Sequence, residues 1–381
     1  MSIFNIFKKK DNDQIEEKDK KKEVIESIDK GVEVVQLLSE AYIDLKSLEE
    51  VKSISFKDVE DVGDAFKVLM PAIKAIYEEA NNEGSGLYKL TTTVKDKIPL
   101  DIDSQEYSST ALQLASGKTV ASINPYVLIV VVAVVTIQKE VEIIHSECNR
   151  ILTFLKNDKE SEIEGDISTL NDIVETYKYN WDNKEYCVNH HKLVLDIKRS
   201  AEHNSVFYQK QIDSMISDNK KDIASKSTEA RLKEFENCFN YYQLSLYLYA
   251  YASYLELLLL GNFDKRYLDS VKAKLQSNID NYQSHYVQTL EKLNLLANSS
   301  TESKALKGIG GLLQKVKKVN WISNTGTTLI NVGNKQTLDA FEALQEPTSK
   351  VFIDKIDELS FLSSDEIETY FDKDNIIFVK K

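Results

Sequence analysis

The sequence predicts a mainly all-α protein, an elongated bundle of long helices with a small β-hairpin or tongue-like segment and a C-terminal appendage. Only 12 glycines and 4 prolines occur among 381 residues, so few positions interrupt a helix. Apolar residues recur at steps of three and four over long stretches, which is the spacing of one helix face. Hydrophobic residues make up 42% of the chain, enough for a core, and this excludes a wholly disordered protein.

The chain is acidic, with 48 Lys and Arg against 61 Asp and Glu. Because an acidic surface repels phosphate backbones, we expect nucleic acid not to be a partner. Three widely separated cysteines, an odd number, indicate reduced thiols rather than a disulfide framework. The apolar stretch at Met1–Phe7 is too short for a secretion signal, so we expect a cytoplasmic protein, peripheral to a membrane if it acts there.

The N-terminal part divides into a tail and the start of a helical bundle. Residues 1–22 form a charged tail that cannot bury a face. A long-helix bundle is then expected over 23–297. Apolar spacing predicts its first helix within 24–45 and a second within 59–76, which Pro71 kinks or divides.

A polar insertion at 86–122 interrupts the helical pattern. Residues 87–94 are rich in β-branched side chains and predict a strand, with 95–102 as its return. The stretch 116–119 (Ser-Gly-Lys-Thr) resembles the end of a phosphate-binding loop. However, Leu112 stands where that loop needs its first glycine, so we expect a turn.

The most apolar stretch of the chain is 126–137, preceded by Asn124 and Pro125 as a helix start. Beyond it, apolar residues continue at alternating steps of four and three to Leu155, and again from Ile163 to Trp181. This is the seam of a coiled coil. It predicts one helix over 125–181, or two nearly collinear ones, approaching roughly 80 Å in length.

Further long helices are predicted at 190–217, 228–260 and 264–297. The first is amphipathic through five positions: Leu193, Ile197, Val206, Ile212 and Met215. Residues 241–260 are apolar or aromatic on nearly every face, with Glu256 as their one formal charge. Gly261 is the expected C-cap of that helix.

The C-terminal part consists of a Gly-containing amphipathic segment at 298–346 and a region at 347–381 with one helix and a short terminal strand at 375–379. No sequence signature of an active site occurs, so we expect a non-enzymatic protein without a cofactor. Four residues suggest zinc, but the paired ligands of a zinc site are missing, and we expect no metal. They are Cys187, His190, His191 and His203.

Two segments are candidates for contact with a membrane or a partner. The first, within 126–137, is too short for an ordinary bilayer crossing, so it is either a helix buried in the bundle or a sequestered membrane element. The second, at 308–318, is either a cationic amphipathic helix for an anionic membrane surface or a small hairpin that covers the bundle. The candidate residues are Tyr126, Val127, Leu128, Ile129, Val131, Val134, Ile309, Leu312, Leu313, Lys315, Lys317 and Lys318.

The sequence combines long helices that carry apolar seams with a short, very apolar segment and a polar insertion before it. In this combination it resembles the α-helical pore-forming proteins of the ClyA and haemolysin BL kind. The resemblance concerns the architecture of residues 23–297 and no specific motif. It implies a soluble helical bundle that extrudes an apolar head or β-tongue at a membrane. The alternative is a soluble interaction or scaffold protein whose seams bind a second copy or a helical partner.

Overall fold

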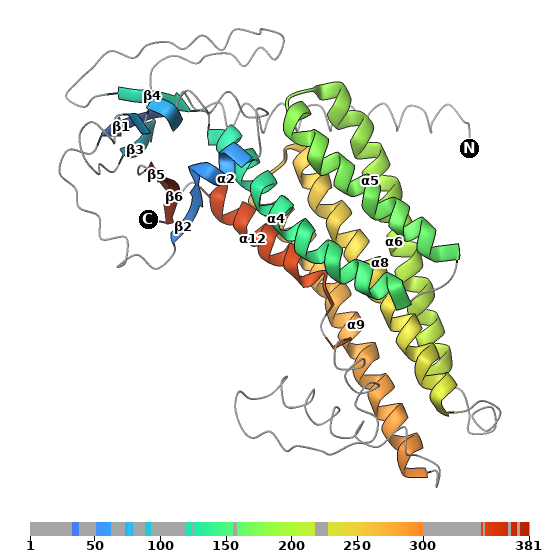
Figure 1. Cartoon of the computed structure of the whole chain (residues 1–381). Coiled ribbons are helices and arrows are strands. Elements are labelled where there is room, and N and C mark those ends of the chain that lie inside the picture. Colours follow the sequence, from blue (N-terminus) through green and yellow to red (C-terminus); the bar gives the residue numbers. More distant parts are fainter. Residues whose placement is uncertain are drawn as a thin grey trace, which may run out of the picture.

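The computed structural model describes residues 33–37, 51–61, 73–75, 77–78, 88–92, 119–123, 125–154, 158–217, 228–299, 344–345, 347–364, 367–371 and 374–380. Long helices dominate this part of the chain, and a small sheet lies at one end of them (Figure 1). The prediction of a mainly all-α fold with a small β element is confirmed. The charged tail at 1–22 and the amphipathic segment at 308–318 lie outside the described residues.

Four long helices run side by side and alternate in direction (Figure 1). They are α5 (Asp158–Asn180), α6 (Lys184–Ser217), α8 (Thr228–Leu260) and α9 (Lys265–Ser299). Two more, α4 (Pro125–Phe154) and α12 (Lys350–Leu362), pack on this group. The most extensive helix pairing in the described chain is that of α6 with α8.

Helix α8 is the centre of the bundle, with α4, α5, α6, α9 and α12 all in contact with it. This explains why residues 241–260 are apolar on every face: within them, only Glu256 and Leu260 are not fully buried. Four buried tyrosines of the bundle, Tyr177, Tyr251, Tyr254 and Tyr282, direct their hydroxyls to oxygen acceptors in other parts of the chain, which offsets the cost of burying a polar group. Tyr251 Oη donates to Asn171 Oδ1 at 3.0 Å, and Tyr282 Oη to the carbonyl of Leu344 at 2.7 Å.

The prediction of one helix over 125–181, or of two nearly collinear ones, is wrong. Tyr254 and Tyr251, three residues apart on α8, bond to Ala133 of α4 and to Asn171 of α5. In a continuous helix those two partners would lie roughly 57 Å apart, at 1.5 Å per residue. The chain therefore turns back between α4 and α5, and the two helices pack together (Figure 1).

The seam positions of α5 do form its packed face, as their spacing indicated. Five of the six are fully buried and Trp181 is partly so. The buried ones are Ile163, Ile167, Leu170, Val174 and Tyr177. In α6 the predicted face is only partly correct, because Ile197 and Ile212 are buried whereas Leu193 and Val206 are exposed.

The described strands form one antiparallel sheet in the order β2-β6-β5-β3-β1-β4. Their bounds are β1 Glu33–Leu37, β2 Val51–Ser55, β3 Tyr88–Thr92, β4 Thr119–Ile123, β5 Ile367–Phe371 and β6 Asn375–Lys380. The sheet contains strands from the N-terminal and the C-terminal parts of the chain, since Ser53 of β2 pairs with Ile377 of β6. Helix α2 (Phe56–Asp61) follows β2 directly and connects the sheet to α4.

Strands β3 and β6 confirm two predictions, whereas the other four strands differ from what the sequence pattern predicted. Residues 33–37, predicted as helix, form strand β1. A short β-branched run fits the spacing of a helix and that of a strand equally well, and here pairing with the distant strands β3 and β4 favours the strand. Strands β2, β4 and β5 were not predicted at these positions. The return strand expected at 95–102 lies outside the described residues, and β3 instead lies between β1 and β5.

Candidate functional site

The apolar segment of α4 is built into the core. Val131 and Val134 are 0% exposed, Val127 and Leu128 are buried, and Ile129 is partly buried. The side chain of Tyr126 is outside the described residues. The candidate residues from Ile309 to Lys318 also lie outside the described residues.

Helices α5, α8, α12 and α2 pack on α4, the helix that contains this segment. The hydroxyl of Tyr254, in α8, donates to the carbonyl of Ala133 at 3.3 Å. Burial raises the pKa of Tyr254 above its usual range, so its hydroxyl keeps its proton and remains a donor. The covering helices thus satisfy polar groups in addition to excluding water.

Ion pairs surround the covered segment on its sheet side. Lys139 of α4 pairs with Asp58 of α2 at 2.7 Å, and this hydrogen bond lowers the pKa of Asp58. Lys355 of α12 pairs with Glu140 of α4 at 3.2 Å. These contacts fix α2 and α12 against the same turn of α4.

A cavity of about 140 Å³ lies where β2, α2, α4 and α12 meet. Its wall includes Lys52, Lys139 and Lys355. Each of the three is paired with a carboxylate that also lines the cavity: Glu358, Asp58 and Glu140, respectively. The charges of the wall therefore neutralise one another rather than converge on a ligand.

A second polar cluster lies between α6, α8 and α9. Glu256 accepts a hydrogen bond from Lys198 Nζ at 2.6 Å and one from the hydroxyl of Tyr267 at 3.4 Å. Its other neighbour is His191, with Nε2 3.8 Å from Glu256 Oε1. Burial alone would raise the pKa of Glu256, but His191 and Lys198 outweigh it and the pKa lies below its usual value.

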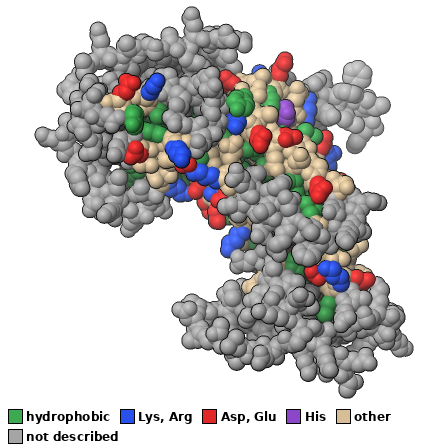
Figure 2. Space-filling model, viewed as in Figure 1, with side chains coloured by type: hydrophobic (Ala, Val, Ile, Leu, Met, Phe, Trp, Pro, Cys, Tyr) green, Lys and Arg blue, Asp and Glu red, His purple; other side chains and the backbone are tan. Residues whose placement is uncertain are grey.

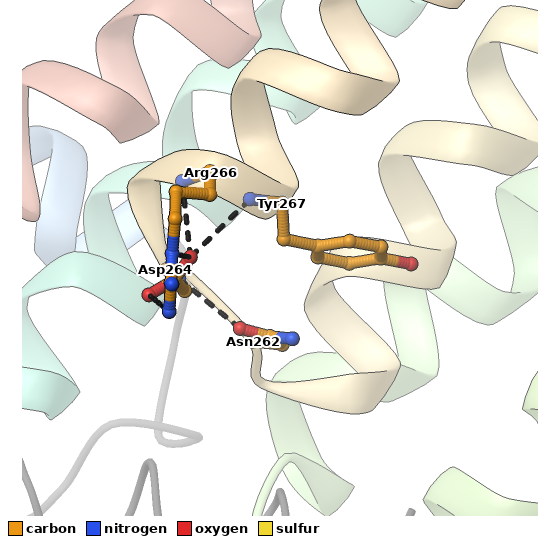
Figure 3. A network of polar contacts seen from close by, with 4 residues as sticks. All are labelled: Asn262, Asp264, Arg266 and Tyr267. Carbon is orange, nitrogen blue, oxygen red and sulfur yellow. Dashed lines mark hydrogen bonds and ion pairs between the residues drawn. The ribbon is translucent and has the colours of Figure 1, made fainter.

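The turn between α8 and α9 positions Tyr267 for that contact (Figure 3). Gly261 ends α8 at a φ of 60°, as its predicted role as C-cap requires. Asp264 Oδ1 then accepts bonds from the backbone N–H groups of Arg266 (3.0 Å) and Tyr267 (3.4 Å), which caps the start of α9. The Arg266 guanidinium pairs with the same carboxylate and lowers its pKa.

The outward face of α6 carries exposed apolar side chains. Of the eight large exposed hydrophobic residues in the described chain, five lie on this one helix. They are Val188, Leu193, Leu195, Val206 and Phe207. The sequence pattern assigned two of them, Leu193 and Val206, to the packed face of the helix, because apolar spacing alone does not show which apolar positions remain exposed.

The residues that suggested zinc point to separate partners. Cys187 is buried and its Sγ lies 3.7 Å from the carbonyl oxygen of Asn180. His190 Nδ1 bonds to the carbonyl of Tyr186, whereas His191 faces Glu256. Among the residues that the structure describes, no three His, Cys, Asp or Glu side chains form a group that could hold a metal ion.

Acidic and basic side chains are interspersed over the visible described surface, without one large field of either sign (Figure 2). No described helix combines the length and apolar character that a bilayer crossing requires. No protein-family model matches this chain, and no curated protein or solved structure is significantly similar to it.

Proposed function

We propose that this chain is a non-catalytic helical-bundle protein that acts through contacts on its outer helices, as an interaction or scaffold protein. One observation carries the proposal. The segment at 127–137 is buried against neighbouring helices, whereas the exposed apolar side chains of the described surface gather on α6. A helix face with exposed apolar residues between charged ones is suited to a protein partner.

Membrane action in the manner of the α-helical pore-forming proteins is the second candidate. The observation in its favour is the cover of the apolar segment, whose ion pairs leave several charged groups partly in water. The side chains of Lys139 and Asp58 are 58% and 25% exposed. Such pairs contribute little stability, roughly 0 to 1 kcal/mol, so they oppose release of the cover only weakly.

Vesicle co-sedimentation, paired with thermal melts, tests the two candidates. The proteins compared are the wild type, Val131→Lys and the control Leu295→Lys, which places a lysine at an exposed position of α9. For an interaction protein, we expect wild type to stay in the supernatant with anionic vesicles at pH 7.4 and 5.0. Val131→Lys should unfold or melt far lower, because a lysine there is buried without a partner, whereas Leu295→Lys should melt like wild type.

A wild type that co-sediments and causes leakage would contradict the interaction proposal. The membrane candidate further requires that Val131→Lys keep its soluble fold and lose vesicle binding. A lysine at the centre of a membrane helix costs about 2.5–3.5 kcal/mol on insertion scales.

A further inference from the structure

A heptad-like seam of largely exposed residues runs along α6 beside its buried face, on the side of α9. Its first half consists of Val188, Lys192, Leu195 and Arg199, at steps of four, three and four. All four side chains are exposed. Residues at this spacing lie in one line along a helix, so the four form a continuous strip.

The second half of the seam continues the same spacing. Glu202, Val206 and Asp213 are exposed, and Gln209 between the last two is partly buried. The first half therefore carries two basic residues and the second half two acidic ones. Each half also has at least one exposed apolar residue, such as Leu195 (37%) and Val206 (39%).

We propose that this outer seam is a self-association surface, on which the α6 helices of two copies of the chain pair antiparallel about a two-fold axis. The inference rests on the proposed function and names its partner. A two-fold interface must be self-complementary, so that each residue i meets j and each j meets i. The seam is basic in one half and acidic in the other. When two copies pair antiparallel, the basic half of each copy therefore faces the acidic half of the other, and the surface is self-complementary.

The axis passes between Ser200 and Ala201, at the centre of the seam. Leu195 then lies opposite Val206 of the partner subunit, and Arg199 opposite Glu202 of the partner subunit. Each contact occurs twice. Parallel pairing would instead place Arg199 against its own copy and Glu202 against its own copy, and like charges across an interface are strongly unfavourable.

Arg199 and Glu202, the charged residues nearest the centre of the seam, have exposed partners within the monomer, whereas Asp213 Oδ1 lies 3.1 Å from Nε2 of the largely buried His285 of α9. Arg199 pairs with Asp196, and Glu202 pairs with Lys274 of α9 at 3.2 Å. In the second pair both side chains are about half exposed, at 51–52%. Exposed pairs of this kind contribute little, so they yield to contacts with a second copy.

Charge reversal measured by analytical ultracentrifugation of the full chain tests the proposal. Wild type should sediment as a dimer that dissociates on dilution. Arg199→Glu and Glu202→Arg each set like charges against each other twice, and should raise the dimer dissociation constant by about tenfold or more. The double variant restores opposite charges and should return to within about threefold of wild type. Asp269→Arg, an exposed change on α9, should leave the dimer unchanged.

Disulfide trapping tests the orientation. Leu195→Cys combined with Val206→Cys should form disulfide-linked dimers on mild oxidation, whereas Leu195→Cys alone should not exceed wild type. In the antiparallel pair the two copies of residue 195 are roughly 16 Å apart along the helix, beyond the reach of a disulfide. Efficient trapping by the single variant would overturn the antiparallel arrangement.

A monomeric wild type at high concentration, or a dimer that tolerates both single reversals, would overturn the self-association surface. A double variant that fails to recover would do the same. None of these results touches the proposed function, which fails only if the wild type binds and permeabilises vesicles.

Discussion

Lys198 Nζ lies 2.6 Å from Glu256 Oε2, an ion pair that joins α6 to α8 inside the bundle. The side chains are only 21% and 13% exposed. Glu256 is the one formal charge within residues 241–260, a stretch whose uniformly apolar surface offers little to fix its position along a neighbour. We infer that the pair specifies the register between α6 and α8, a recognised role of polar groups in helix packing.

Removing one partner of this pair should cost more than removing both. Lys198→Met leaves the Glu256 carboxylate largely buried without its cation, and should lower the free energy of unfolding by about 2–4 kcal/mol. Lys198→Met combined with Glu256→Gln should recover most of that loss. Urea denaturation of the wild type, both single variants and the double variant gives the coupling energy.

The Lys139–Asp58 pair provides the matched control, because it is similarly short, at 2.7 Å, but more exposed. Lys139→Met should cost less than about 1 kcal/mol. Equal costs at the two sites would show that burial does not strengthen the Lys198–Glu256 interaction.

The Lys198–Glu256 pair also predicts how the stability of the protein changes in acid. The pKa of Glu256 is lower in the folded protein than in the unfolded chain, where it is about 4.3. The ionised Glu256 therefore contributes its full share of the folding stability above the pKa of the unfolded chain. That share is lost as the pH falls through the pKa of the folded protein. Wild type should therefore lose stability more steeply below pH 4.5 than Lys198→Met combined with Glu256→Gln. Urea midpoints measured between pH 3 and 6 test this, and parallel curves would contradict it.

The turn between α8 and α9 should depend on the carboxylate of Asp264. Asp264→Ala removes the acceptor for two backbone N–H groups and should cost about 1 kcal/mol, whereas Asp264→Ser keeps an N-cap and should cost less. Thermal melts distinguish the two variants. Because Tyr267 follows this cap and contacts Glu256, the alanine variant should also weaken the coupling between Lys198 and Glu256.

Local spacing predicted the helices that pack along their whole length. Leu170 and Val174 are buried where the seam placed them, and Gly261 ends α8 as expected. These features depend on residues close in the sequence, so a single sequence contains their signal. The burial of residues 241–260 of α8 on every face also agrees with their composition.

Long-range pairing could not be predicted in the same way. Val35 fits a helix face, yet it pairs with Leu90 in the sheet, and Ser53 pairs with Ile377 more than three hundred residues away. Neither partner is visible from local pattern. The Lys198–Glu256 contact is similarly non-local, and only the isolation of Glu256 in an apolar stretch hinted at a partner.

The last prediction concerns Asp166 on α5. Burial, with a smaller contribution from the charge of Glu162, raises its pKa to about 6. Because this value exceeds that of the unfolded chain, the folded protein binds the extra proton at low pH, and stability is lost as the pH rises through about 6. Asp166→Asn removes the charge and should stabilise the protein by about 1–2 kcal/mol at pH 7.5, a value below the full shift because the side chain is partly solvated. The gain should shrink steadily as the pH falls to 4.5, and Glu162→Gln should give a smaller gain of the same sign. Urea denaturation at both pH values measures it, and an equal gain at pH 4.5 and 7.5 would show that the asparagine acts through a new hydrogen bond rather than through charge.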